Sequence, residues 1–136
     1  MRTPSQTVGP FYAIGLSRRP ADELAADGVE LTGTLYDGQG EPIVDGVVEV
    51  FDSVSRRWGR SGTEANGRFR FRIARETARL EAHVFARGLL RHQLTRIHLD
   101  GSASAEDETL VAVRDGDGYR FDIRMQGERA TLFFEH

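Results

Sequence analysis

Strict alternation of arginine with apolar side chains runs through Arg68-Phe69-Arg70-Phe71-Arg72-Ile73. Successive side chains of a β-strand point to opposite faces of a sheet, so this order places the phenylalanines and the isoleucine on one face and the arginines on the other. Residues 119–125 repeat the design, with tyrosine, phenylalanine, isoleucine and methionine at every second position. Both stretches predict strands with one face in a hydrophobic core and one face in solvent.

Six further segments are expected to form strands, and together they define the fold class. They are residues 29–36, 43–51, 79–87, 93–99, 109–114 and 130–135. About eight short strands joined by glycine-containing turns predict an all-β fold, an antiparallel β-sandwich or a partly closed barrel. At most one short helix is expected, over residues 20–26, which open with Pro20.

The length of 136 residues corresponds to one domain with a core of its own. Alternation begins at Val29 and is missing from the residues before it. We therefore divide the chain into an N-terminal arm, residues 1–28, and a β-sandwich, residues 29–136. An arm without alternation is either disordered or laid against another surface.

The composition argues against several classes of protein. Cysteine is absent, which removes disulfides, thiolate metal sites and cysteine nucleophiles. All 18 basic residues are arginine, so no lysine can form a Schiff base or serve a Walker loop. The net charge of −3 does not predict a nucleic-acid surface, and no apolar run approaches the roughly 20 residues that cross a membrane. Residues 1–6 lead into no apolar signal core, so we expect a cytoplasmic protein.

The side chains that commonly carry chemistry form no recognisable site. The four histidines are expected at the surface or in interfaces, since His83 would need two or three more ligands beside it to hold a metal. Neither a Gly-x-Ser-x-Gly motif nor a glycine-rich phosphate loop is present. Two unusual stretches remain. One is the proline-rich start Thr3-Pro4-Ser5-Gln6-Thr7-Val8-Gly9-Pro10, and the other is Phe85-Ala86-Arg87-Gly88, with an arginine at a strand end.

Both stretches resemble signatures of the intradiol ring-cleavage dioxygenases, as do residues 119–128 and 131–134. The resemblance is greatest to the alpha subunits of members that cleave protocatechuate, and it runs through the chain in order. It implies that alpha and beta subunits share one β-sandwich plan and pair with each other. The beta subunit is implied to hold a non-haem Fe(III) through two tyrosines and two histidines. That subunit opens the ring of protocatechuate with O2 to give 3-carboxy-cis,cis-muconate.

The resemblance also implies that this chain holds no iron. Counted back from Phe85, the positions of the beta subunit's His-x-His carry Arg79 and Glu81 here. Residues 52–59 and 74–79 are shorter than the segments that bring the tyrosine ligands. A guanidinium and one carboxylate cannot replace two imidazoles and two phenolates. We therefore expect no metal ligand and no catalytic residue in this chain, and we expect the Fe(III) in the beta subunit.

The family pattern carries over to four substrate-binding positions. Gly9 and Pro10 are implied to line the substrate pocket, with Thr7 close by, and Arg87 to lie near the carboxylate of the bound aromatic acid. A fixed guanidinium that binds a carboxylate contributes about 1.5 to 3 kcal/mol. The family's tyrosine after Gly-Pro is Phe11 here, so its hydroxyl is missing. The expected partners are an iron-bearing beta subunit, protocatechuate and O2. The αβ units are expected to assemble into larger multiples, and no nucleic acid or membrane is expected as a partner.

Two other hypotheses stay open at the level of sequence. A transthyretin-like β-sandwich could bind a carbohydrate or a protein without any enzyme attached, because a fold alone does not determine a function. Such modules usually display aromatic side chains, and Trp58 is the only obvious candidate. The third hypothesis is a self-assembling scaffold that binds no ligand.

Overall fold

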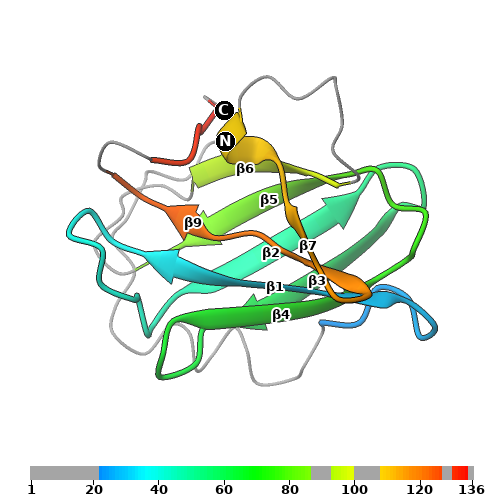
Figure 1. Ribbon diagram of the computed structural model, residues 1–136, viewed down its shortest axis with the longest axis horizontal. Helices are drawn as coiled ribbons and strands as arrows, with labels where there is room; N and C mark the ends of the chain where they lie inside the picture. The colour runs from blue at the N-terminus through cyan, green and yellow to red at the C-terminus, as the bar shows by residue number, and fades with distance from the viewer. Residues whose placement is uncertain (1–21, 87–92, 100–107, 127–129, 135–136) are drawn as a thin grey trace, which may run out of the picture.

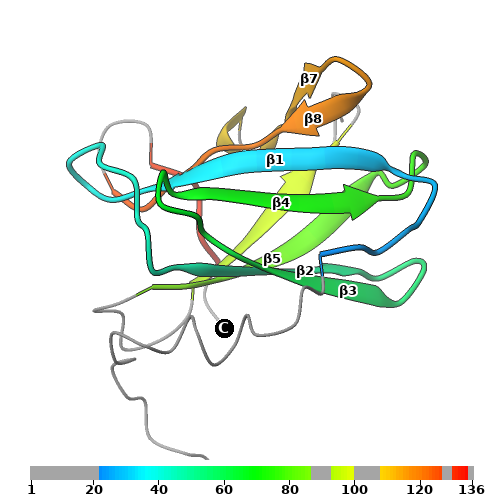
Figure 2. The ribbon, with the colours of Figure 1, turned by 90° about the horizontal axis from the view of Figure 1, so that it is seen from below.

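The computed structural model describes residues 22–86, 93–99, 108–126 and 130–134. Two sheets lie face to face in it (Figures 1 and 2). The first sheet has the order β4-β1-β8-β7 with β9 also paired to β1, and the second has the order β3-β2-β5-β6. The elements are β1 (Val29–Tyr36), β2 (Val47–Asp52), β3 (Arg57–Gly62), β4 (Arg68–Ile73), β5 (Arg79–Phe85), β6 (Gln93–His98), the 3-10 helix η1 (Glu108–Leu110), β7 (Val113–Asp115), β8 (Gly118–Arg120) and β9 (Ile123–Arg124).

The predicted all-β sandwich is confirmed. Most strand pairs are antiparallel, and β1 is the exception because it runs parallel to both β8 and β9. Within the described residues, no helix is long and apolar enough to cross a membrane.

The alternating stretch that predicts the fold is β4. Phe69, Phe71 and Ile73 are at most 1% exposed, whereas the arginines between them face outward. The antiparallel register places Phe71 opposite Leu31 of β1. The facing sheet adds Val48, Val50, Leu80, Ala82, Val84 and Ile97 to the same buried cluster. Burial of a large apolar side chain contributes about 1.5 to 3 kcal/mol, so this layer holds the two sheets together.

Residues 119–125 form two short strands rather than the one expected, because a side chain interrupts the ladder. The amide of Phe121 donates to the Thr32 carbonyl at 2.8 Å, as a continuous strand would. At the next step the amide of Thr34 donates to Asp122 Oδ1, at 3.0 Å, instead of to a backbone carbonyl. Pairing with β1 resumes at Ile123, opposite Leu35.

The helix expected over residues 20–26 is wrong for the part that the structure describes. Glu23 instead forms a parallel bridge with Arg72, and the Leu24 amide donates to the Arg72 carbonyl at 2.8 Å. Leu24 is 5% exposed and belongs to the core cluster. Burial of this leucine and pairing with the edge of β4 replace the hydrogen bonds that one helical turn would offer.

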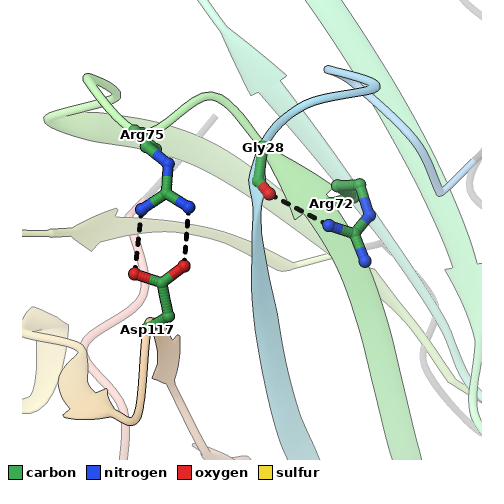
Figure 3. A network of polar contacts seen from close by, with 4 residues as sticks. All are labelled: Gly28, Arg72, Arg75 and Asp117. Atoms are coloured by element: carbon green, nitrogen blue, oxygen red, sulfur yellow. Dashed lines mark hydrogen bonds and ion pairs between the residues drawn. The ribbon is translucent and has the colours of Figure 1, made fainter.

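Arginine side chains fasten the same segment to the sandwich. Arg72 Nη1 donates to the Gly28 carbonyl at 2.9 Å (Figure 3), and Arg57 Nη1 donates to the Leu24 carbonyl, also at 2.9 Å. Arg72 belongs to the first sheet and Arg57 to the second. Residues 22–28 are therefore held by both layers.

Other boundaries differ where the local pattern is weak. β3 carries no apolar alternation, so the sequence did not predict this strand. It forms because it pairs with β2 along its whole length. Residues 43–46 precede β2 rather than belonging to it, and residues 109–114 divide between η1 and β7. Residues 130–134 form no strand, and only an isolated bridge joins Phe134 to Leu94. The expected turns are confirmed by positive φ angles of 81°, 76° and 59° at Gly40, Gly67 and Gly116.

Candidate functional site at the outer face of the second sheet

Strand β5 gives the outer face of the second sheet its chemical character. Leu80, Ala82 and Val84 are at most 1% exposed and face the core. The alternate positions Arg79, Glu81, His83 and Phe85 are partly or fully exposed on the other face. The alternation predicted for residues 79–87 is therefore confirmed through Phe85, the last residue of β5.

The four predicted substrate-binding residues, Thr7, Gly9, Pro10 and Arg87, lie outside the described residues. Phe11, His92 and His136 lie outside them as well. What the structure does place is the strand that leads to Arg87, which follows Phe85 by two positions.

On the same outer face, strands β2 and β3 carry an ion pair and an exposed tryptophan. Glu49 of β2 lies opposite His83, and its carboxylate binds Arg60 of β3, with Arg60 Nε donating to Glu49 Oε1 at 2.7 Å. The Arg60 guanidinium also lies 5.3 Å from the centre of the Trp58 ring. Trp58 is 54% exposed. The aromatic side chain expected for a binding module is thus at the surface, but it stacks with an arginine.

A ferric site of the kind implied by the resemblance does not fit the described residues. The positions of the expected histidine pair present a guanidinium, Arg79, and a carboxylate, Glu81, on the outer face of β5. The described tyrosines, Tyr36 and Tyr119, belong to β1 and β8 of the opposite sheet. No group of three or more histidine, cysteine, aspartate or glutamate side chains in the described part of the chain could hold a metal ion.

The described histidines do not converge either. His98 lies opposite Arg79 in the β5–β6 ladder, whereas His83 lies opposite Leu94. At about 3.3 Å per residue, the four-residue offset separates the two histidines by roughly 13 Å. The two rings therefore cannot share one ion.

A pocket of about 380 Å³ opens at the end of the sandwich where β5 begins. Its walls come from the β2–β3 turn, the β4–β5 connection, the first residue of β5 and the last residue of β6. The lining residues are Asp52, Ser53, Val54, Ser55, Ala74, Glu76, Thr77, Ala78, Arg79 and His98. Sequence reasoning marked two of these segments only as shortened and did not predict a pocket. The available signal was Asp52, a charged residue at the inward position that follows Val48 and Val50.

An ion pair holds the β4–β5 connection, which forms one wall of this pocket. Arg75 binds Asp117 through two hydrogen bonds of 2.8 and 2.7 Å, which join the β4–β5 connection to the β7–β8 turn (Figure 3). The hydrogen bond from Arg75 lowers the pKa of the Asp117 carboxyl below its ordinary value, and Asp117 raises the pKa of Arg75. Both side chains are well exposed, so the pair positions the connection more than it stabilises the fold.

Comparison with curated proteins gives two relatives of nearly full length. The protocatechuate 3,4-dioxygenase alpha chain of Burkholderia cepacia is 30% identical over 191 positions, covering 98% of this chain and 97% of the relative. The alpha chain of Pseudomonas putida is 28% identical over 192 positions, covering 98% and 96%. Both alignments are longer than the 136 residues of this chain and therefore contain gaps in it. No family model matches the chain.

Comparison with solved structures gives the same fold. The dioxygenase domain of a dioxygenase carbohydrate-binding fusion from Streptomyces sp. SirexAA-E superposes with a TM-score of 0.61 at 20% identity, covering 93% of this chain and 99% of that domain. Hydroxyquinol 1,2-dioxygenase from Pseudomonas putida DLL-E4 gives a TM-score of 0.59 at 16% identity, covering 80% and 60%. Fold and full-length similarity agree, and the chain belongs to the family of protocatechuate 3,4-dioxygenase alpha chains.

Proposed function

We propose that this chain is the metal-free alpha subunit of a cytoplasmic protocatechuate 3,4-dioxygenase and acts only together with an iron-bearing beta subunit. The relatives support the assignment because they are alpha chains and match over 97% and 96% of their length. The partner supplies the Fe(III) that the cleavage of protocatechuate by O2 requires. The alpha chain supplies part of the substrate pocket, and αβ units assemble into larger multiples.

The observation that carries the metal-free role is the outer face of β5. Arg79 and Glu81 stand two residues apart on that face, at the positions where the resemblance expects two histidines. A guanidinium has no lone pair to give a metal, and a lone carboxylate cannot hold a ferric ion. This chemistry supports the proposal that another polypeptide holds the iron.

The proposed contribution to substrate binding comes from the arm and from the end of β5. Thr7, Gly9 and Pro10 line the partner's pocket, and Arg87 binds the substrate carboxylate. Alternation along β5 supports the last assignment, because Arg87 continues the series of odd positions that face outward up to Phe85. Residues 22–28 support the first assignment, since their contacts with both sheets fix the end of the arm that joins the sandwich.

Co-production with a beta subunit of the same enzyme family tests the proposal. The isolated chain should contain no stoichiometric iron and should take up no O2 with protocatechuate. The assembled complex should contain iron and consume O2 with protocatechuate. Iron bound tightly by the isolated chain would overturn the metal-free role.

The assignment of Arg87 has its own test in the assembled complex. Loss of a charge-assisted contact of about 1.5 to 3 kcal/mol should raise KM for protocatechuate about 10- to 150-fold in Arg87→Ala. The iron spectrum should stay unchanged, because the arginine does not touch the metal. Arg68→Ala, an exposed arginine at the start of β4, is the matched control. An unchanged KM in Arg87→Ala removes this residue from the substrate pocket.

A further inference from the structure

Asn66 is the only asparagine of the chain, and it stands directly before Gly67 in the turn that joins β3 to β4. Asparagine is a thermolabile residue, and a following glycine has no side chain to hinder attack on the asparagine side chain. We propose that Asn66–Gly67 is a modification site gated by the fold, which is protected while the turn is closed and deamidates when the turn opens. The inference concerns this chain alone and does not rest on its pairing with a beta subunit.

The reaction consumes only water. The backbone nitrogen of Gly67 loses its proton and bonds to Cγ of Asn66, and the bond from Cγ to Nδ2 breaks as ammonia leaves. Water then opens the cyclic succinimide at one of its two carbonyls. One opening gives aspartate, and the other gives isoaspartate, in which the main chain runs through Cβ and Cγ. Each route takes up one water and releases one ammonia, without oxidation or reduction.

The closed turn holds the proton that must leave first. The Gly67 amide donates to the Glu64 carbonyl at 2.8 Å. Gly67 is buried, although Asn66 beside it is exposed. A buried, hydrogen-bonded amide gives up its proton to solvent only when the local structure opens. The Gly67 nitrogen is therefore withheld from the reaction in the folded chain.

The turn also holds the peptide plane in the wrong orientation for ring closure. In a turn closed by a bond from the fourth residue to the first, the third residue, here Asn66, has a ψ of about 0°. Ring closure needs Cβ, Cα, C and the next nitrogen nearly in one plane. Because the substituents on Cα are tetrahedral, the peptide plane must rotate by roughly 120° out of the turn.

Contacts on both sides of the peptide oppose that rotation. Asn66 Oδ1 accepts the Arg68 amide at 3.1 Å. The Gly67 carbonyl accepts the Leu35 amide of β1 at 2.9 Å, and Gly67 has a φ of 76°. A Cβ placed on Gly67 would stand 2.7 Å from Cβ of Pro42, so Pro42 packs directly against this backbone. Attack at Asn66 thus requires the turn to leave β1 and Pro42.

The two products differ in how they fit the turn. Aspartate keeps a side-chain oxygen at position 66 that accepts the Arg68 amide. Isoaspartate adds one methylene to the main chain inside a loop closed by two bonds, from the Glu64 amide to the Arg68 carbonyl at 2.9 Å and from the Gly67 amide to the Glu64 carbonyl. The longer loop disturbs this pairing. Since β3 and β4 belong to different sheets, the change weakens the connection between the two layers and marks a chain that has opened.

Incubation of the full chain at mildly alkaline pH, folded or in urea, tests the gate. Peptide mass spectrometry measures aspartate and isoaspartate at position 66. Deamidation should be at least about tenfold slower in the folded chain, and deuterium exchange of the Gly67 amide should be slowed by a similar factor, because both reactions use the same open state. Equal deamidation rates in the two conditions, or a Gly67 amide that exchanges as fast as in urea, would overturn the proposal.

Two variants separate the site from its consequence. Asn66→Gln is the matched control, because ring closure from glutamine needs a larger ring, so the acidic product at position 66 should disappear over the same period in urea. Asn66→Asp represents the aspartate product and should unfold at the same urea concentration as the unmodified chain. The isoaspartate form, isolated by chromatography, should unfold at a clearly lower concentration. An isoaspartate form as stable as Asn66→Asp would refute the claim that the modification marks opened chains.

Discussion

Replacement of Gly33 by alanine tests a close approach between β1 and the segment that joins β8 to β9. Gly33 lies in β1, opposite Phe69 of β4, and is buried. An added Cβ would collide with the carbonyl oxygen of Phe121 and would stand 2.5 Å from the end of the Phe69 ring. The ring can tilt, but the carbonyl belongs to the backbone between β8 and β9. The Phe121 segment must therefore move away from β1.

The cost of that movement follows from the bonds on either side of Gly33. The Phe121 amide donates to Thr32 at 2.8 Å, and the Thr34 amide donates to Asp122 at 3.0 Å. Two lost hydrogen bonds cost about 2 kcal/mol, and overpacking of a core costs about 1 to 3 kcal/mol more. The free energy of unfolding should fall by about 3 to 5 kcal/mol, a large share of the 5 to 15 kcal/mol typical of a domain.

Urea unfolding followed by circular dichroism measures this loss. Gly38→Ala is the matched control, because the added Cβ there meets only the side chain of Gln126, with its Oε1 at 2.9 Å. A flexible side chain can move, so the control should change stability by less than about 0.5 kcal/mol. A loss below about 1 kcal/mol in Gly33→Ala, or equal losses in both variants, would contradict the packing that we describe.

Three further predictions concern polar contacts and backbone conformation. Because Arg75 lowers the pKa of Asp117, the pair contributes to stability at neutral pH, and this contribution is lost as pH falls through the lowered pKa. Arg75→Ala should raise the Asp117 pKa measured by NMR titration, and an unchanged pKa would exclude the contact in solution. Arg57→Ala should increase amide exchange at Leu24 about tenfold, since one carbonyl bond of residues 22–28 is lost, whereas Arg68→Ala should not. Arg56 has a φ of 63°, so Arg56→Gly should raise the unfolding free energy by up to about 1 kcal/mol, and a clear loss of stability would show that the arginine side chain matters more than the strain.

Local alternation was sufficient to predict several strands closely. The expected bounds of β1 and β4 agree with the structure at both ends, and β5 and β6 begin at the expected residues. The reason is that a strand with one buried face needs an apolar side chain at every second residue, so its pattern is visible in the sequence. The resemblance likewise identified the family from short motifs, and its four site residues stay predictions.

Contacts between segments far apart in sequence decided the rest. β3 has no apolar pattern and is a strand only because β2 pairs with it, and the carboxylate of Asp122 divides one expected strand into two because it reaches Thr34, 88 residues away. The pocket at the end of the sandwich is lined by the β2–β3 turn and the β4–β5 connection, which are far apart in the sequence. The sequence by itself thus determined the class of fold, the alternating strands and the family. Only the tertiary structure decided which polar groups converge, because a side chain's distant neighbours leave no mark in its local pattern.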